Sequence, residues 1–170
     1  MSTDGQRNPR IDAETLAERM RKHATFLEWD REINGKLYYA LWILFMGGFA
    51  LSITPRVSGL TGSLCTLWLL RAFRILAVVG SALNFELQNR AINQVRYSRE
   101  QIREYEQHIA HAETAPQKAL AAYHRANDLE TTLKSIDAQI PKIELGLKLC
   151  AVGFLIVAIC LTWRSVPNLQ

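Results

Sequence analysis

The acidic residues of this chain lie in two separate blocks, and this distribution constrains the fold more than any other feature. Of its 170 residues, 16 are Asp or Glu, and all of these fall within residues 1–32 or 86–144. A soluble core normally has charge on the outer side of every amphipathic element, so long acid-free stretches are unusual in one. The pattern predicts a multi-pass membrane protein and disfavours a soluble bundle of three buried helices.

Three apolar stretches are long enough to cross a bilayer, which requires roughly 20 helical residues. The first, residues 37–54, contains no charge, and the third comprises residues 145–163. The second, residues 60–83, carries Arg71 and Arg74 near its middle. We therefore expect three transmembrane helices in an all-α integral membrane protein.

The distribution of Lys and Arg predicts the orientation, because cytoplasmic segments retain positive charge. Seven of these residues lie in residues 1–36 and eight in residues 84–144. Only Arg56 lies between the first two stretches, and only Arg164 lies in the tail, residues 164–170. Three spans place the two basic blocks on one side, so both are predicted to be cytoplasmic and the tail external. The expected location is the plasma membrane, the inner membrane of a bacterium.

Residues 84–144 show apolar positions spaced alternately by three and four, which is the pattern of two heptad seams. The seams are separated at Thr114-Ala-Pro-Gln117, where Thr114 is expected to cap a new helix with Pro116 in its first turn. We expect a cytoplasmic antiparallel coiled-coil hairpin, kinked in its second arm at Pro141. The seam is predicted to contain Val95, Ile102, Ile109, Leu129, Leu133, Ile136 and Ile140.

The N-terminal segment, residues 1–36, is predicted to form a separate amphipathic helix that ends before Gly35. This helix either covers the hairpin or lies on the membrane surface. Its expected apolar side consists of Leu16, Met20, Phe26, Leu27 and Ile33.

No residue pattern in the chain indicates catalysis, and we expect no enzymatic activity and no cofactor. All three cysteines fall inside predicted spans, which disfavours disulfides and metal binding: Cys65, Cys150 and Cys160. Three histidines near the hairpin turn occupy diverging heptad positions, which also disfavours a metal site: His108, His111 and His124. Basic residues alternate with acidic ones, so nucleic acid is not an expected partner.

Arg71 and Arg74 are the residues most expected to carry function. An arginine near the bilayer centre costs ~2.5 to 3.5 kcal/mol on insertion scales, so two of them require a reason. They share a helix face, and no predicted span contains an acid that could pair with them. The remaining partners are lipid phosphate, backbone carbonyls, pore water or an acidic residue of another protein, and snorkelling in an off-centre span is an alternative.

Aromatic and basic residues around the first two spans resemble the SLATT superfamily, predicted two-span membrane effectors found with bacterial nucleotide-signalling and conflict systems. The resemblance covers roughly residues 15–110. It is carried by the strings HATFLEWDREINGKLYYALWI and ALNFELQNRAINQVRYSREQIREYE, in particular by Trp29, Tyr38, Tyr39, Phe85, Ala91, Tyr97 and Arg103. It implies an oligomeric pore that permeabilises the membrane and is switched by a cytoplasmic partner.

Two functions remain open at this point. One is an oligomeric pore-forming effector in which Arg71 and Arg74 face water. The other is a non-catalytic scaffold subunit whose hairpin docks a cytoplasmic protein and whose arginines contact lipid or that partner. Small residues in all three spans support a homo-oligomer in membrane lipid under either hypothesis.

Overall fold

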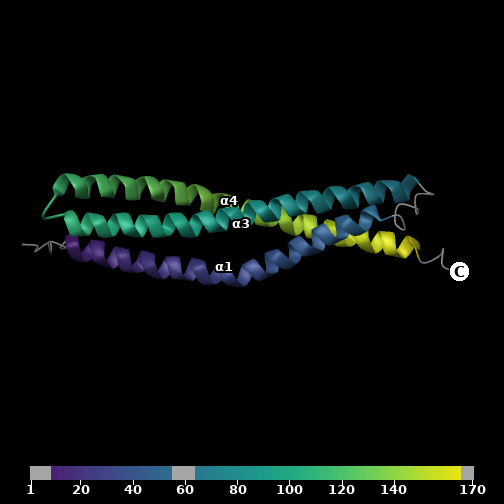
Figure 1. Ribbon diagram of the computed structural model, residues 1–170, viewed down its shortest axis with the longest axis horizontal. Coiled ribbons are helices and arrows are strands. Elements are labelled where there is room, and N and C mark those ends of the chain that lie inside the picture. The colour runs from purple at the N-terminus through teal and green to yellow at the C-terminus, as the bar shows by residue number, and fades with distance from the viewer. Residues whose placement is uncertain (1–8, 55–63, 166–170) are drawn as a thin grey trace, which may run out of the picture. The chain divides into compact units, whose positions relative to one another are not determined.

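A computed structural model of the chain describes residues 9–54 and 64–165, and every element in it is an α-helix (Figure 1). The elements are α1 (Pro9–Ile53), α3 (Leu64–His111) and α4 (Pro116–Ser165), with no strand among the described residues. The all-α prediction is confirmed. Each of the three helices is long and apolar enough to cross a membrane, as judged by length and composition.

The helices do not end where the sequence predicts boundaries. A single helix, α1, contains both the N-terminal segment and the first apolar stretch, and Gly35 lies inside it without interrupting it. A glycine in a helix costs about 1 kcal/mol, whereas ending the helix leaves several backbone groups without partners. The prediction of a separate N-terminal helix was therefore wrong. In the same way, α3 and α4 each run unbroken from an apolar stretch into the polar block.

The turn between α3 and α4 differs by one residue from the prediction. Pro116 is the first residue of α4, and the carbonyl of Ala115 accepts hydrogen bonds from the amides of Lys118 (2.9 Å) and Ala119 (3.1 Å). A residue that precedes proline is kept out of the helical conformation, so Ala115 rather than Thr114 is the residue at the helix boundary. Further along, α4 continues through Pro141.

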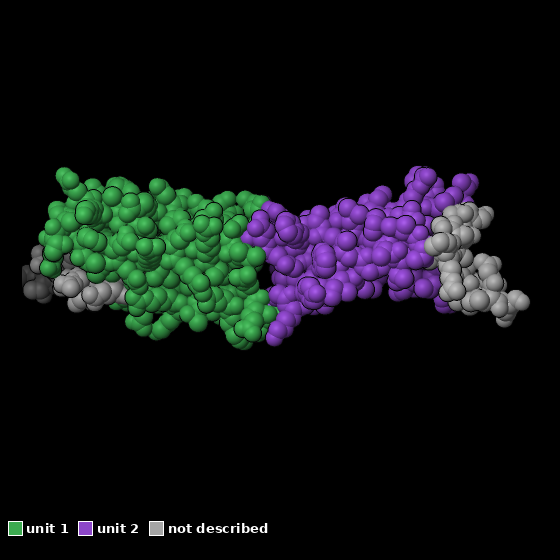
Figure 2. All heavy atoms as spheres, viewed as in Figure 1, with its two compact units in different colours: residues 1–33, 90–139 green, residues 34–89, 140–170 purple. Residues whose placement is uncertain are grey.

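The chain divides into two compact units, and each of the three helices contributes to both (Figure 2). The polar unit consists of residues 1–33 and 90–139, and the apolar unit of residues 34–89 and 140–170. The division falls next to Gly35 in α1 and Pro141 in α4. Glycine and proline are the residue types that weaken a helix most.

Small side chains fill the interior of the polar unit. Alanine is buried on α1 at Ala17 and Ala24 and on α4 at three positions spaced by three and four residues, namely Ala119, Ala122 and Ala126. Larger apolar residues are buried on α3 at Val95, Ile102 and Tyr105 and on α4 at Ile136. Alanine at the contact allows helix axes to approach closely, and the apolar area buried per residue is small.

The predicted apolar side of the N-terminal helix is divided between core and surface. Met20 and Leu27 are half-buried within the polar unit, whereas 56% of Phe26 and 50% of Ile33 are exposed. Residues at the spacing of Ala17, Met20 and Leu27 form one heptad stripe. Phe26 and Ile33 lie about 100° away from that stripe on the helix, so they cannot face the same core.

Aromatic residues dominate the interior of the apolar unit. Its buried cluster consists of Phe45, Ala77, Leu87, Leu147 and Phe154. The Phe154 ring stacks on Phe73, with centroids 4.2 Å apart, and meets Phe45 edge-on at 5.3 Å. These contacts join all three helices.

Candidate functional site

Arg74 of the apolar unit binds the end of α1. Its Nη2 donates to the backbone carbonyl of Ser52 (2.7 Å), and its Nε donates to the hydroxyl of the same residue (3.2 Å). Ser52 is buried and lies in the last turn of α1, which contains no basic residue of its own. The last carbonyls of a helix lack intrahelical donors and carry partial negative charge, so Arg74 supplies both a donor and a cation to this end.

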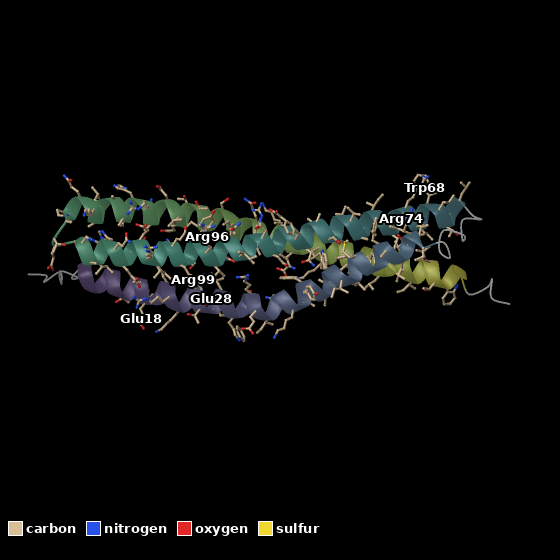
Figure 3. The ribbon with its side chains drawn as sticks, viewed as in Figure 1. Glu18, Glu28, Trp68, Arg74, Arg96 and Arg99 are labelled. Atoms are coloured by element: carbon tan, nitrogen blue, oxygen red, sulfur yellow. The ribbon has the colours of Figure 1, made fainter. Side chains whose placement is uncertain are left out.

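Arg71 lies one helical turn before Arg74, and its side chain is exposed. The guanidinium carbon is 5.5 Å from the centroid of the Trp68 ring, within the range of a cation–π contact. The indole of Trp68 is itself 67% exposed. In Figure 3, Trp68 lies on the outer side of α3 and Arg74 lies beside the end of α1.

The sequence placed both arginines on one helix face, but their head groups have different partners. One of the partners that the sequence left open, a backbone carbonyl, is present at Arg74. Sequence reasoning missed Ser52 and Trp68 as members of the site. The position of Trp68 three residues before Arg71 was a usable signal, because residues at that spacing are neighbours on a helix surface.

The outer surface of the apolar unit is apolar on all three helices. Its exposed large side chains include Trp42, Ile43, Leu44 and Leu51 on α1, Trp68, Ile75, Val78 and Val79 on α3, and Leu149, Val152, Leu155, Ile156, Ile159 and Trp163 on α4. Apolar groups exposed over such an extent point to an environment other than water.

A fully buried amide lies inside the apolar unit. Asn84 has no exposed surface, and its Nδ2 donates to the backbone carbonyl of Tyr38 (2.6 Å). Its Oδ1 accepts a hydrogen bond from Nε2 of Gln88 (3.0 Å). Asn84 thus links α1 to α3, and both its amide nitrogen and its amide oxygen have hydrogen-bond partners. The sequence did not predict this contact.

The predicted seam residues are distributed between interior and half-buried positions. Val95, Ile102 and Ile136 are buried in the polar unit. The half-buried members are Ile109, Leu129 and Leu133, together with Ile140, which packs against the core of the apolar unit.

A cavity of about 260 Å³ opens between the three helices of the polar unit. Its walls combine apolar and polar side chains, namely Arg19, Met20, His23, Leu27, Gln94, Ser98, Gln101, Leu133 and Asp137. Nε2 of Gln94 donates to Oδ1 of Asp137 (2.5 Å) across this wall. Arg19 and His23 have no hydrogen bond or ion pair within the part of the chain that the structure describes. The cavity therefore offers two unpaired nitrogen groups next to an apolar wall.

Ion pairs on the surface of the polar unit connect its helices. Arg99 Nη2 lies 2.6 Å from Glu28 Oε1 (Figure 3). Arg21 pairs with Glu106, so two ion pairs join α1 to α3. Glu18 is paired along α1, where a hydrogen bond from Lys22 lowers the pKa of its carboxyl. Burial raises the pKa of the Tyr105 phenol in the core of this unit.

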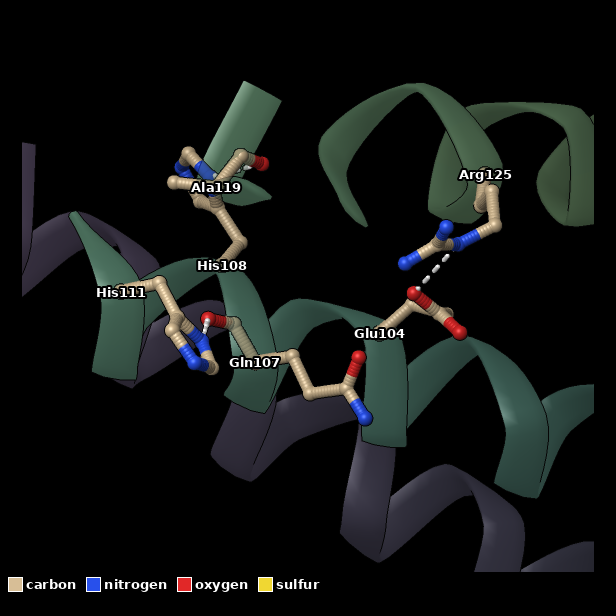
Figure 4. Close-up of polar contacts among 6 residues, drawn as sticks. All are labelled: Glu104, Gln107, His108, His111, Ala119 and Arg125. Atoms are coloured by element: carbon tan, nitrogen blue, oxygen red, sulfur yellow. Dashed lines mark hydrogen bonds and ion pairs between the residues drawn. The ribbon is translucent and has the colours of Figure 1, made fainter. Parts of the chain in front are cut away.

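The histidines near the turn bind backbone oxygens (Figure 4). Nδ1 of His108 donates to the carbonyl of Ala119 (2.9 Å), and Nδ1 of His111 donates to that of Gln107 (2.8 Å). Arg125 pairs with Glu104 at 2.9 Å next to them. Among the residues described, no group of three or more His, Cys, Asp or Glu side chains is arranged to hold a metal ion.

No protein-family model, curated protein or solved structure matches this chain.

Proposed function

We propose that this protein is a non-catalytic scaffold subunit of a membrane complex. In this proposal the apolar unit anchors the chain in the bilayer with three spans, and the polar unit docks a protein partner. The observation that carries the proposal is the surface of the apolar unit, which presents large apolar side chains on every helix around a core of packed aromatic rings. A water path through a membrane requires polar lining groups or a gated constriction, whereas an anchor requires neither.

The charge distribution supports an orientation with the N-terminus and the polar unit in the cytoplasm of a bacterial cell. Residues 1–36 and 84–144 together hold most of the Lys and Arg of the chain, and Arg56 and Arg164 are the cations outside these blocks and the spans. The tail, residues 164–170, is then external.

The cavity of the polar unit is the part of the docking module whose chemistry is most specific. Arg19 and His23 supply donors that no other described residue binds, and Leu27 and Leu133 supply an apolar wall. This combination fits a partner segment that carries a carboxylate next to an apolar side chain.

An oligomeric pore-forming effector of the SLATT type is the second candidate. The observation that favours it is Arg71, a charged side chain exposed among large apolar side chains of α3 such as Trp68 and Ile75. Gly47 is an exposed small residue of the first span, and a Cβ atom there would meet nothing within 4 Å, so it would allow copies to pack closely. A ring of arginines contributed by several copies would attract anions.

Purification in mild detergent followed by measurement of particle mass, composition and symmetry tests the proposal. A scaffold subunit is expected to co-purify with a second protein in an asymmetric particle, and Arg19→Glu with His23→Glu should release that protein. Arg96→Glu is the control, because Arg96 is exposed and outside the cavity. A closed ring of this chain alone, with a chloride-selective conductance in planar bilayers that Arg71→Glu inverts, would contradict the scaffold and support the pore.

A further inference from the structure

Arg71 lacks a counter-ion within its own unit. In residues 34–89 and 140–170, the acidic residues are Glu86 and Glu144. Glu86 is 15 positions along the same helix, roughly 22 Å away at 1.5 Å per residue. Glu144 is paired with Lys148 at 2.7 Å. Neither acidic side chain of the apolar unit is therefore paired with Arg71 among the residues that the structure describes.

The guanidinium groups lie at the end of the span and not at its centre. Side chains in a helix tilt toward its N-terminus, so those of Arg71 and Arg74 lead back toward Leu64, where α3 begins. The Arg74 head group reaches Ser52, one residue before α1 ends at Ile53. Two exposed indoles mark the same end of the apolar unit, Trp68 on α3 and Trp163 near the end of α4. Tryptophan is enriched at the level of lipid head groups.

The chemistry of the two arginines matches phosphate. The Arg71 guanidinium carbon lies 5.5 Å from the centroid of the Trp68 ring. Arg71 makes no hydrogen bond or ion pair with another residue that the structure describes, so its N–H donors remain available. A planar guanidinium presents paired donors that bind phosphate oxygens bidentately. Arg74 donates to Ser52 through Nε and Nη2. Its Nη1 remains as a further donor for a phosphate bound at Arg71.

We propose that Arg71, supported by Trp68, binds the phosphate of a phospholipid in the leaflet that meets the first turns of α3, with Arg74 held beside it by Ser52. This inference rests on the proposed membrane anchoring. A phospholipid bilayer supplies phosphate at the depth of interfacial tryptophan, and the described residues of the apolar unit supply no acidic side chain near Arg71. Binding removes the cost of an unpaired guanidinium in the apolar span without requiring water or a second protein.

Native mass spectrometry of the delipidated full-length protein in detergent tests the site. The probes are phosphatidylglycerol, the phosphate-free lipid digalactosyldiacylglycerol, and inorganic phosphate without lipid. We expect the native protein to retain phosphatidylglycerol in preference to the galactolipid. Arg71→Leu should weaken that binding about tenfold, the effect of losing one charge-assisted bidentate contact. Arg71→Lys should weaken it less, because the charge remains.

Arg103→Leu is the matched control, since Arg103 is an exposed arginine of the same helix that lies in the polar unit. Equal phosphatidylglycerol binding by Arg71→Leu and Arg103→Leu would overturn the proposal. So would binding of the galactolipid by the native protein as tightly as phosphatidylglycerol. Retention of inorganic phosphate at the same affinity would overturn the lipid assignment and indicate a site for soluble anions. Unchanged phosphatidylglycerol binding by Arg71→Leu, together with co-purification of an acidic protein by the native chain but not by the variant, would assign Arg71 to that partner instead.

The membrane anchoring is tested separately by labelling a cysteine at Val152, an exposed position of the apolar unit distant in sequence from both arginines. Rapid labelling of Val152→Cys in lipid nanodiscs would refute the anchoring itself. Protection of this cysteine, with unchanged lipid binding by Arg71→Leu, would refute the phosphate site alone.

Discussion

The two units of this chain use the same three helices but pack them in different ways. The polar unit buries alanines on α1 and α4 and connects its helices at the surface with ion pairs such as Arg99–Glu28. The apolar unit buries phenylalanines, seats them against glycines and contains a hydrogen-bonded Asn84 in its interior.

This difference is the one expected if water surrounds the polar unit and, as we propose, lipid surrounds the apolar unit. In water, removal of even small apolar groups from solvent is favourable, so a thin seam of alanine contributes to stability. In lipid, the surroundings are as apolar as the interior, so helix association depends on shape complementarity and interhelical hydrogen bonds. In the apolar unit, phenylalanine rings packed against glycines provide the shape complementarity, and the buried amide of Asn84 provides an interhelical hydrogen bond.

The largest expected effect is the burial of a charge in the polar unit. Ile136→Asp places a carboxylate at a position that is 9% exposed, and an unpaired buried charge costs several kcal/mol. Unfolding by urea in mild detergent, followed by circular dichroism, should show loss of helix at a much lower urea concentration. His124→Asp, at an exposed position of the same helix, should be nearly silent. Equal sensitivity at both positions would mean that the seam does not face a core.

A pair of neighbouring glycines tests shape complementarity in the apolar unit. A Cβ atom on Gly48 would overlap the Phe154 ring and lie 3.1 Å from Phe73, whereas one on Gly47 would meet nothing within 4 Å. Gly48→Ala should therefore lower the free energy of unfolding by about 1 to 3 kcal/mol, the usual cost of overpacking. Gly47→Ala should not lower it and should raise it by up to about 1 kcal/mol, because alanine is favoured over glycine in a helix and meets no obstacle here. The comparison can be measured by thermal unfolding in detergent, and a reversed order would contradict the packing described.

Removal of the buried amide should have a smaller effect. Asn84→Ala deletes the hydrogen bond to the Tyr38 carbonyl, and polar contacts between membrane helices contribute about 0.6 to 2 kcal/mol. Asn89→Ala changes the same residue type at an exposed position of α3 and should be neutral. If Asn84→Ala were as stable as Asn89→Ala, the hydrogen bond from Asn84 to Tyr38 would not contribute to the association of α1 with α3.

The smallest effect is expected for the ion pairs of the polar unit. The Arg99 and Glu28 side chains are largely exposed, and pairs of this kind contribute roughly 0.2 to 1 kcal/mol. A double-mutant cycle with Arg99→Gln and Glu28→Gln should give a coupling energy in this range at low salt. The coupling should disappear at 1 M salt, where the screening length falls to about 3 Å. A coupling that persists at high salt would place the pair in a less polar environment.

The sequence predicted those features that depend on composition and periodicity. Acid-free stretches located the three apolar segments, and the spacing of residues such as Val95 and Ile102 located buried positions on α3. Helix boundaries were not predictable, because Gly35 and Pro141 weaken a helix locally while their neighbours continue it. The partner of Arg74 was also not predictable. It is a backbone carbonyl on another helix, and a carbonyl carries no signal in the sequence.

The central claim is that a bilayer surrounds one unit and water the other, and two cysteines on the same helix test it most directly. Val152 of the apolar unit and Asn127 of the polar unit both have exposed side chains on α4, so the protein itself shields neither. Single cysteines at these positions, in a chain with Cys65, Cys150 and Cys160 replaced by alanine, would be reacted with a charged maleimide in lipid nanodiscs. We predict rapid labelling of Asn127→Cys and labelling of Val152→Cys only after denaturation. Equal labelling rates at the two positions in the intact nanodisc would contradict the account.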